Sequence, residues 1–255
     1  MTRLDRVLIT GATGGLGQAL VATYANSHTE LALQYRSDSG MAQRLAALAG
    51  ESGARAVALQ QDLSVADIDS EARHFLARVH NELGAVNVAV LNAAAQDVTP
   101  WHELSSKDFD DMYQVTFRAA AVLLQQLGEQ LAELPHDNRV IAVVGSIEGF
   151  RPAPGHAPYA VMKAALHHLV KAAAHELGVH GVRVVGVAPG LIDRPGLETD
   201  WADGVQRWQL AAALGRPVTA LEVANTLAFL TSPAASGITG VVVPVDAGWS
   251  AHPGW

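Results

Sequence analysis

The sequence lacks cysteine entirely, which excludes disulfides, thiolate metal sites and a cysteine nucleophile. It also lacks an uncharged apolar run of about 18 residues, so we expect no transmembrane helix and no membrane partner. Basic residues are scarce, since 17 Lys and Arg stand against 25 Asp and Glu and give a net charge of −8. Such a chain is a poor nucleic-acid binder, and we expect a cytoplasmic protein without a nucleic-acid partner.

Short apolar runs alternate with segments of helical spacing. An apolar share of 49% and a charged share of 16% supply a large core. Uninterrupted apolar strands are typical of a sheet that is buried on both faces. The alternation predicts a single α/β domain over residues 1–255, a Rossmann-type, doubly wound, parallel seven-stranded sheet with helices on both faces. The expected strands are 6–10, 31–35, 56–59, 86–91, 139–144, 182–187 and 241–245, and the expected helices are 16–27, 41–48, 68–83, 109–134, 159–177 and 220–230.

The first expected strand runs into the glycine-rich turn Thr10-Gly-Ala-Thr-Gly-Gly-Leu-Gly17. Glycine allows close backbone approach to a pyrophosphate, and the N-terminus of the following helix adds N–H groups and a positive dipole. A turn of this kind can also serve only to pack a strand against a helix. We predict a dinucleotide site formed by Gly11, Thr13, Gly14, Gly15, Leu16 and Gly17.

The end of the second expected strand bears on the choice of cofactor. Tyr35 stands where an acidic residue binds the ribose of NAD, and Arg36 follows it. A guanidinium at this place suits the 2′-phosphate of NADP(H), which we therefore favour. NAD(H) stays possible, because Asp38 is close enough in sequence to reach the ribose, and Arg36 can also be an ordinary solvated charge.

Residues 146–163 contain a candidate catalytic group. Tyr159 and Lys163 are four residues apart, so they share one face of an expected helix. A nearby cation lowers the pKa of a phenol and helps it to exchange protons. Ser146, just after the fifth expected strand, can hydrogen-bond the substrate oxygen. The alternative is an exposed tyrosine beside an exposed lysine.

These motifs, with Asn92, Pro189-Gly190 and Val245-Asp246, resemble the short-chain dehydrogenase/reductase family over the whole chain. The likeness is greatest to the 3-oxoacyl-acyl-carrier-protein reductase and sugar or alcohol dehydrogenase branches. It implies an NAD(P)(H)-dependent oxidoreductase acting on CH–OH or C=O groups, with Tyr159 as general acid/base. It also implies that Ser146 orients the reacting oxygen and that Lys163 bonds the nicotinamide ribose. Further cofactor contacts implied by the resemblance are Asp62, Leu63, Asn92, Ala93, Ala94, Pro189, Gly190 and Ile192.

Three places depart from the family pattern. The segment Leu91-Asn92-Ala93-Ala94 replaces Asn-Asn-Ala-Gly. Thr116 stands where the family has an asparagine that holds a relay water, and a hydroxyl can still bind such a water. Arg194 replaces a threonine after Pro-Gly, and it can bind an anion or form a loop salt bridge.

The substrate side is less specified. Residues 191–213 correspond to the family's variable substrate loop, and Trp201 there is a candidate wall or lid, or else a packing residue. Glu148 indicates a polar, cationic or hydroxyl-rich small-molecule substrate, unless it is a surface acid. Gln96, His156 and Arg194 are further candidates. We expect no metal site, and we interpret the histidines as surface or interface residues.

Several functional alternatives stay open. Ketone reduction with NADPH is favoured, with an NAD-dependent alcohol or sugar dehydrogenase as the alternative. A non-catalytic dinucleotide-binding regulator belongs to another class, but it has no chemical need for Ser146, Tyr159 and Lys163 together. The resemblance further implies a homo-oligomer, a tetramer or a dimer, paired through long helices that contain alanine runs at 119–121 and 172–174.

Overall fold

The computed structural model describes residues 4–252 and has one central sheet. Seven strands pair in the order β3-β2-β1-β4-β5-β6-β7, and every neighbouring pair is parallel. This confirms the predicted seven-stranded doubly wound sheet, with its switch point between β1 and β4. The strands are β1 (Asp5–Ile9), β2 (Thr29–Tyr35), β3 (Arg55–Gln60), β4 (Val88–Leu91), β5 (Val140–Val144), β6 (Arg183–Pro189) and β7 (Val242–Val245).

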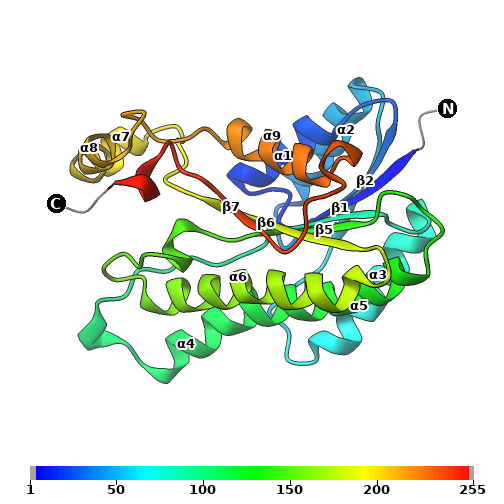
Figure 1. Ribbon diagram of the computed structural model, residues 1–255, viewed down its shortest axis with the longest axis horizontal. Helices are drawn as coiled ribbons and strands as arrows, with labels where there is room; N and C mark the ends of the chain where they lie inside the picture. Colours follow the sequence, from blue (N-terminus) through cyan, green and yellow to red (C-terminus); the bar gives the residue numbers. More distant parts are fainter. Residues whose placement is uncertain (1–3, 253–255) are drawn as a thin grey trace.

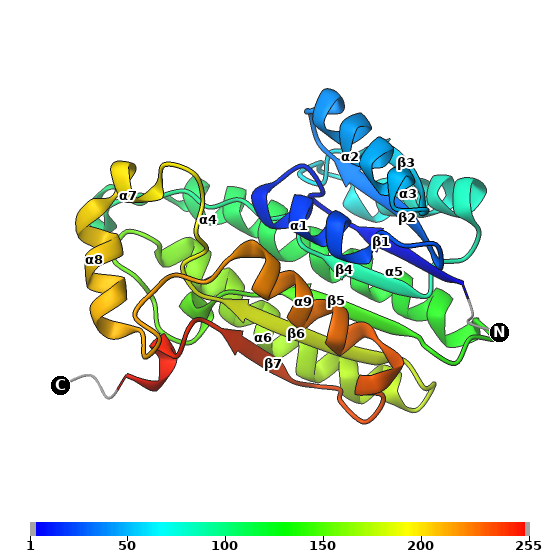
Figure 2. The ribbon, with the colours of Figure 1, turned by 90° about the horizontal axis from the view of Figure 1, so that it is seen from above.

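Helices cover both faces of the sheet (Figure 1). One face carries α1, α2 and α9, and the opposite face carries α3, α5 and α6. The short helices α7 and α8 stand beyond one end of the sheet (Figure 2). The helices are α1 (Gly15–Tyr24), α2 (Ser39–Glu51), α3 (Ile68–Leu83), α4 (Ser106–Met112), α5 (Ala119–Glu133), α6 (Ala157–Gly178), α7 (Leu197–Asp200), α8 (Ala202–Ala211) and α9 (Ala220–Thr231). None of these described helices has the length and apolar character that crossing a bilayer requires.

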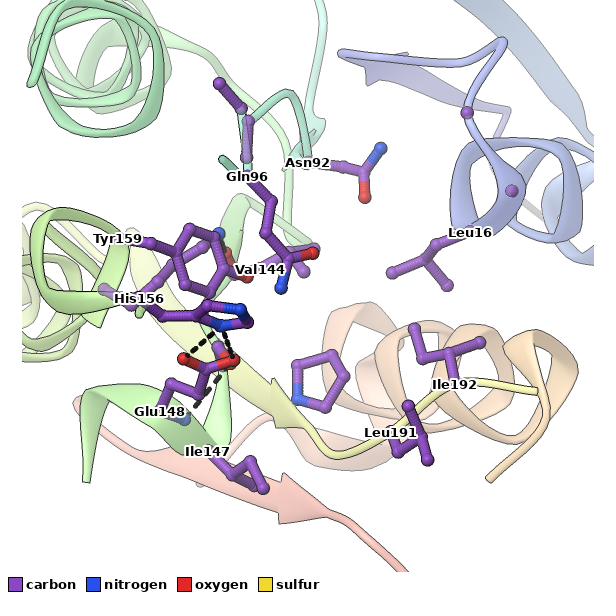
Figure 3. Close-up of a pocket in the computed structure, with 18 of the residues that line it drawn as sticks. Leu16, Asn92, Gln96, Val144, Ile147, Glu148, His156, Tyr159, Leu191 and Ile192 are labelled. Atoms are coloured by element: carbon purple, nitrogen blue, oxygen red, sulfur yellow. Dashed lines mark hydrogen bonds and ion pairs between the residues drawn. The ribbon is translucent and has the colours of Figure 1, made fainter. Parts of the chain in front are cut away.

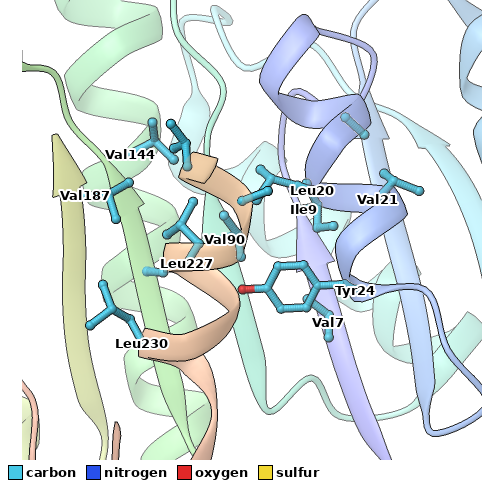
Figure 4. Close-up of a cluster of buried hydrophobic side chains, with 14 of the residues drawn as sticks. Val7, Ile9, Leu20, Val21, Tyr24, Val90, Val144, Val187, Leu227 and Leu230 are labelled. Atoms are coloured by element: carbon cyan, nitrogen blue, oxygen red, sulfur yellow. The ribbon is translucent and has the colours of Figure 1, made fainter. Parts of the chain in front are cut away.

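The strands fill two separate hydrophobic cores because successive side chains point to opposite faces. In β1, Val7 and Ile9 pack under α1 and α9, whereas Leu8 packs on the side of α3 and α5. Figure 4 shows the first of these cores, where the Tyr24 hydroxyl on α1 lies 2.7 Å from Thr231 Oγ1 on α9. Each buried Val, Leu or Ile contributes about 1.5–3 kcal/mol. Rigid packing of this kind fixes the strand ends that surround the site.

The prediction of one continuous helix over residues 109–134 is wrong in one respect. The structure has α4, a π-helical turn η2 (Tyr113–Arg118) and then α5. The turn widens around Thr116, whose hydroxyl lies 3.2 Å from Ala95 N and 3.2 Å from Met112 Sδ. A side chain that inserts into the helical hydrogen-bond pattern commonly produces such a turn, often beside a functional site.

Candidate active site

A cavity of about 1690 Å³ opens where the strands end, next to the switch point of the sheet. Its lining brings together nearly all of the residues that the sequence singled out. Among the predicted catalytic, cofactor and substrate residues, Tyr35 and Thr116 do not line it, and neither does Asp38, the alternative contact to the ribose. The candidates that do are Gly11, Thr13, Gly14, Gly15, Leu16, Gly17, Arg36, Asp62, Leu63, Asn92, Ala93, Ala94, Gln96, Ser146, Glu148, His156, Tyr159, Lys163, Pro189, Gly190, Ile192, Arg194 and Trp201.

The glycines of the first turn differ in what the absence of a side chain makes room for. A Cβ on Gly17 would lie 2.2 Å from the Gly11 carbonyl oxygen, so packing of α1 against the turn requires glycine there. Gly11 has a φ of +65°, and a Cβ on it would lie 3.0 Å from Ala93 Cα. By contrast, a Cβ on Gly15 would meet no protein atom within 4 Å. Because Gly15 borders the cavity, its missing side chain leaves room for a ligand rather than for the protein itself.

The altered turn after β4 keeps its connection to β1. Thr10 Oγ1 accepts hydrogen bonds from Asn92 N at 2.9 Å and from Ala93 N at 3.0 Å. The Asn92 side chain in turn donates to the carbonyl oxygens of Thr10 and Gly11. The remaining asparagine of the family motif therefore holds the two strand ends together at the switch point.

Arg36 and Asp38 differ in their availability to a ligand. Arg36 is exposed and lines the cavity. Asp38 caps the N-terminus of α2, because its Oδ1 accepts a hydrogen bond from Met41 N at 2.9 Å. Asp62, also on the cavity wall, has a lowered pKa because Ser64 donates two hydrogen bonds to it and the Arg36 charge adds to the effect.

Ser146, Tyr159 and Lys163 converge on the cavity from two elements. Ser146 follows β5, and Tyr159 and Lys163 stand one turn apart on α6. Lys163 is almost completely buried, its Nζ donates to the Val144 carbonyl at 2.8 Å, and it lies 5.4 Å from the centre of the Tyr159 ring. Burial lowers the pKa of Lys163 to about 7.

The Tyr159 phenol is more basic than a free tyrosine. Burial raises its pKa to about 12, hydrogen bonding by Ser146 opposes the shift, and the Glu148 charge adds to it. This direction is opposite to the lowering that the Tyr-x-x-x-Lys spacing predicts. The reason is that burial removes hydration from the phenolate, and this loss is the largest influence on the Tyr159 pKa.

Thr116 is fully buried behind the cavity wall. Its hydroxyl accepts a hydrogen bond from Ala95 N and can donate to the Ala95 carbonyl at 3.3 Å or to Met112. A hydroxyl with these partners supports the loop after β4. A role of Thr116 in holding a relay water stays a prediction.

His167 lies behind the cavity wall, and its sequence position did not mark it as a functional residue. It lies one turn after Lys163 on α6, and it is buried rather than on the surface. Its Nε2 faces Ser146 N at 3.4 Å, and Phe150 covers its ring at 4.3 Å. Glycines at 145 and 149 make space for the imidazole, since a Cβ at either would come within 2.5 Å of it. A sequence signal for His167 exists, because it follows Tyr159 and Lys163 at intervals of four residues and so shares their face of the helix.

Two substrate candidates form a pair. His156 Nδ1 lies 2.9 Å from a Glu148 carboxylate oxygen, and both side chains are largely buried. Figure 3 shows this pair beneath the Tyr159 ring, with Gln96 reaching into the same space from the loop after β4.

The segment 191–213 contains α7 and α8 and closes the far side of the cavity. Arg194 forms a salt bridge with Asp200 at 2.7 Å, in agreement with the loop salt bridge considered for it. Trp201 lines the cavity with 48% of its surface exposed. Trp208 stacks on Trp249 with ring centres 5.2 Å apart, which attaches α8 to the C-terminal segment.

A glycine turn at the switch point of a doubly wound sheet, with serine, tyrosine and lysine on the same cavity, defines a class of protein. That class is the dinucleotide-dependent oxidoreductases with a Rossmann-type fold.

Comparisons with known proteins agree with this class. Residues 11–250 match the family model described as enoyl-(acyl carrier protein) reductase. The chain is 31% identical to L-rhamnose 1-dehydrogenase (NAD(P)(+)) of Sphingomonas sp. (strain SKA58), over 95% of this chain and 94% of the relative. It is thus a member of the short-chain dehydrogenase/reductase family, and its dehydrogenase relatives support an oxidoreductase that acts on CH–OH or C=O groups with NAD(P).

Two solved structures illustrate the likeness in three dimensions. Acetoin dehydrogenase from Enterobacter cloacae superposes with a TM-score of 0.88 at 26% identity, covering 100% of this chain and 98% of the other. A blue fluorescent protein from a metagenomic library, in complex with NADPH, gives a TM-score of 0.87 at 26% identity, covering 97% of this chain and 98% of the other.

Proposed function

We propose that this protein reduces a ketone to a secondary alcohol with NADPH, using Tyr159 as the general acid. The observation that carries the proposal is the meeting of Ser146, Tyr159 and Lys163 on the cavity bordered by the glycine turn. When bound, the nicotinamide cofactor supplies the hydride that the carbonyl carbon receives. The open space at Gly15 fits a pyrophosphate at the N-terminus of α1.

The residues for the remaining parts of the cofactor follow the cavity wall. Asp62 and Leu63 are proposed for the adenine, and Asn92 to Ala94 for the middle of the molecule. Lys163 is proposed for the nicotinamide ribose. Pro189, Gly190 and Ile192 also line the cavity and are proposed for the nicotinamide.

The preference for NADPH rests on two charged side chains. The exposed Arg36 guanidinium is available on the cavity wall for a 2′-phosphate. Asp38, the competing acceptor for a ribose hydroxyl, is occupied in capping α2. Tyr35 lies outside the cavity lining and offers no acid in its place.

Proton transfer is the contribution of the protein's own groups. A tyrosine with a pKa of about 12 keeps its proton at neutral pH, which is the state that donates to a developing alkoxide. Ser146 Oγ accepts a hydrogen bond from Glu148 N at 3.1 Å, so its O–H is left to donate, toward Tyr159 in the structure and toward the carbonyl oxygen when a substrate is bound. Two donors then fix the reacting oxygen in one position.

The substrate would enter between the Glu148 side of the cavity and residues 191–213, with Trp201 as an outer wall. Association into a homo-oligomer through α5 and α6 stays a prediction. The alanine runs give it limited support, because Ala119, Ala120, Ala173 and Ala174 are already buried within the subunit.

Replacing Tyr159 by phenylalanine tests the proposed function. Tyr159→Phe removes the proton donor but little volume, so we expect turnover to fall by about 10³-fold or more while the NADPH dissociation constant changes less than about threefold. In the wild type, alcohol oxidation needs the phenolate, whose fraction grows about tenfold per pH unit below a pKa of about 12. Oxidation should therefore accelerate from pH 7 to pH 9, and reduction should not.

The matched measurements are steady-state rates with NADPH and NADH in both directions, and cofactor titrations by tryptophan fluorescence. Near wild-type turnover of Tyr159→Phe would remove the proposed acid. Cofactor binding without turnover of any ketone or alcohol would favour the non-catalytic regulator, and a preference for NADH would favour the NAD-dependent dehydrogenase.

A further inference from the structure

Glu148 and His156 form a carboxylate–imidazole pair on the cavity wall, beside the groups proposed to hold the reacting oxygen. His156 Nδ1 lies 2.9 and 3.0 Å from the two carboxylate oxygens. Only 14% of the Glu148 side chain and 19% of the His156 side chain are exposed. A surface salt bridge would be far more hydrated, so this pair is a fixed part of the cavity wall.

The pairing determines what the imidazole presents to a ligand. A carboxylate only accepts hydrogen bonds, so Nδ1 carries the proton and faces Glu148. Within residues 4–252, the Nε2 atom has no hydrogen-bond partner. Figure 3 shows the ring between Tyr159 and Glu148, bordering the open centre of the cavity. Nε2 accepts a hydrogen bond when the ring is neutral and donates one when it is protonated, and a hydroxyl group can serve both states.

The position of the pair indicates which hydroxyl it can reach. Glu148 comes two residues after Ser146, and His156 comes three residues before Tyr159 at the start of α6. Three residues of helix correspond to about 4.5 Å. The His156 and Tyr159 rings meet edge to face with centres 6.4 Å apart. The imidazole therefore lies next to the Tyr159 ring, which allows Nε2 and the Tyr159 hydroxyl to bond two neighbouring oxygens of one small substrate.

We propose that the Glu148–His156 pair binds a substrate hydroxyl on the carbon next to the reacting one. The substrates are then α-hydroxy ketones, vicinal diols and sugars that react beside a hydroxyl. This inference rests on the proposed function and names its substrate class. A substrate without that hydroxyl leaves a desolvated Nε2 without a partner, which costs binding in the ground state and in the transition state alike. Gln96 offers a side-chain amide as a further hydrogen-bonding group for a polyhydroxylated substrate.

Matched substrate pairs test the inference. Acetoin and 2-butanone differ by one hydroxyl beside the carbonyl, and D-glucose and 2-deoxy-D-glucose differ by one hydroxyl beside the reacting carbon. The quantity measured is kcat/KM for each compound, with saturating NADPH or NADP⁺. For wild-type enzyme we expect the hydroxylated member to be favoured by about 100-fold in each pair that turns over.

Two variants assign the preference to the pair. His156→Phe keeps a ring and removes Nε2, and Glu148→Gln keeps the shape and removes the charge that orients the imidazole. We expect either change to reduce the preference to within about threefold. The control is His168→Phe, the same change at an exposed histidine of α6 that does not line the cavity, where the preference should persist. NADPH titration of each variant verifies that the cofactor site is intact.

The outcomes separate the inference from the proposed function. Equal kcat/KM within each pair for wild-type enzyme overturns the inference and leaves the ketone reductase in place. A preference that survives in both His156→Phe and Glu148→Gln also overturns it. Turnover of other ketones but of neither acetoin nor D-glucose also overturns the inference. Turnover of no ketone or alcohol at all by a protein that binds NADPH contradicts the proposed function, and the inference fails with it.

Discussion

The two halves of the cavity differ in whether backbone or side chains form their walls. In the cofactor half, formed by the β1–α1 turn and the ends of β2 and β4, the walls are mainly backbone. Glycines approach carbonyl groups closely, and Thr10 and Asn92 connect one strand end to another. In the substrate half, formed by residues 144–167 and 191–213, the walls are side-chain pairs. Glu148–His156, Arg194–Asp200 and Trp208–Trp249 are the principal ones.

This difference shows how the two halves can change independently. A backbone cradle recognises pyrophosphate, which is common to all dinucleotides, and only glycine satisfies its geometry. A side-chain pair can be exchanged without moving the backbone, so it suits the part of the site that distinguishes substrates. Changes in one half should therefore leave the other half working.

The largest expected effect on cofactor binding separates the glycines of the cofactor half. Gly15→Val places a side chain in the open space beside the N-terminus of α1, and we expect the NADPH dissociation constant to rise by about 100-fold or more with an unchanged melting temperature. Gly17→Ala is the matched control, because its Cβ meets the Gly11 carbonyl inside the protein and should lower the melting temperature. Isothermal titration and thermal unfolding measure the two effects. Loss of stability in Gly15→Val would show that the turn needs this glycine for its own packing.

An intermediate effect concerns the charge at the edge of the cofactor half. Arg36→Ala should raise the NADPH dissociation constant about 10- to 100-fold and change that for NADH less than about threefold. Arg44→Ala, at an exposed arginine of α2 that does not line the cavity, is the control. Equal changes for the two cofactors would remove Arg36 as the residue that reads the 2′-phosphate.

The smallest expected effect lies on the substrate side of the cavity. His167→Leu removes the acceptor that faces Ser146 N, and a less well oriented serine should lower kcat by about 10-fold with unchanged NADPH affinity. His167→Gln places an amide oxygen near the same position, and we expect it to restore most of kcat. If the leucine and glutamine variants are equally slow, the acceptor has no part in positioning Ser146.

Much of the fold could be predicted from the sequence because local patterns express it directly. Continuous apolar runs identified all seven strands, and the intervening helices dictated parallel pairing. The glycine turn could also be predicted from the sequence. Glycine is required at Gly11 and Gly17 by backbone atoms that lie a few residues away or on the neighbouring strand end. The family motif likewise brought Ser146, Tyr159 and Lys163 to one cavity.

The features that the sequence did not reveal depend on contacts between distant segments. The π-helical turn at Tyr113–Arg118 forms around a hydroxyl that meets Ala95 on another loop. Glu148 and His156 come together only because the segment between β5 and α6 folds back on itself. The burial of His167 requires glycines at two positions of that same segment. The raised pKa of Tyr159 also reflects tertiary burial, which no residue spacing expresses.

The parallel stack of Trp208 on Trp249 has a practical consequence. Two indoles with an interplanar angle of 4° interact as chromophores, and one of them belongs to α8 while the other follows β7. Any displacement of α8 alters their overlap and hence the near-ultraviolet circular dichroism and emission of the protein. The molecule thus contains its own optical sensor for movement of the loop over the site, readable in stopped-flow experiments without an attached dye.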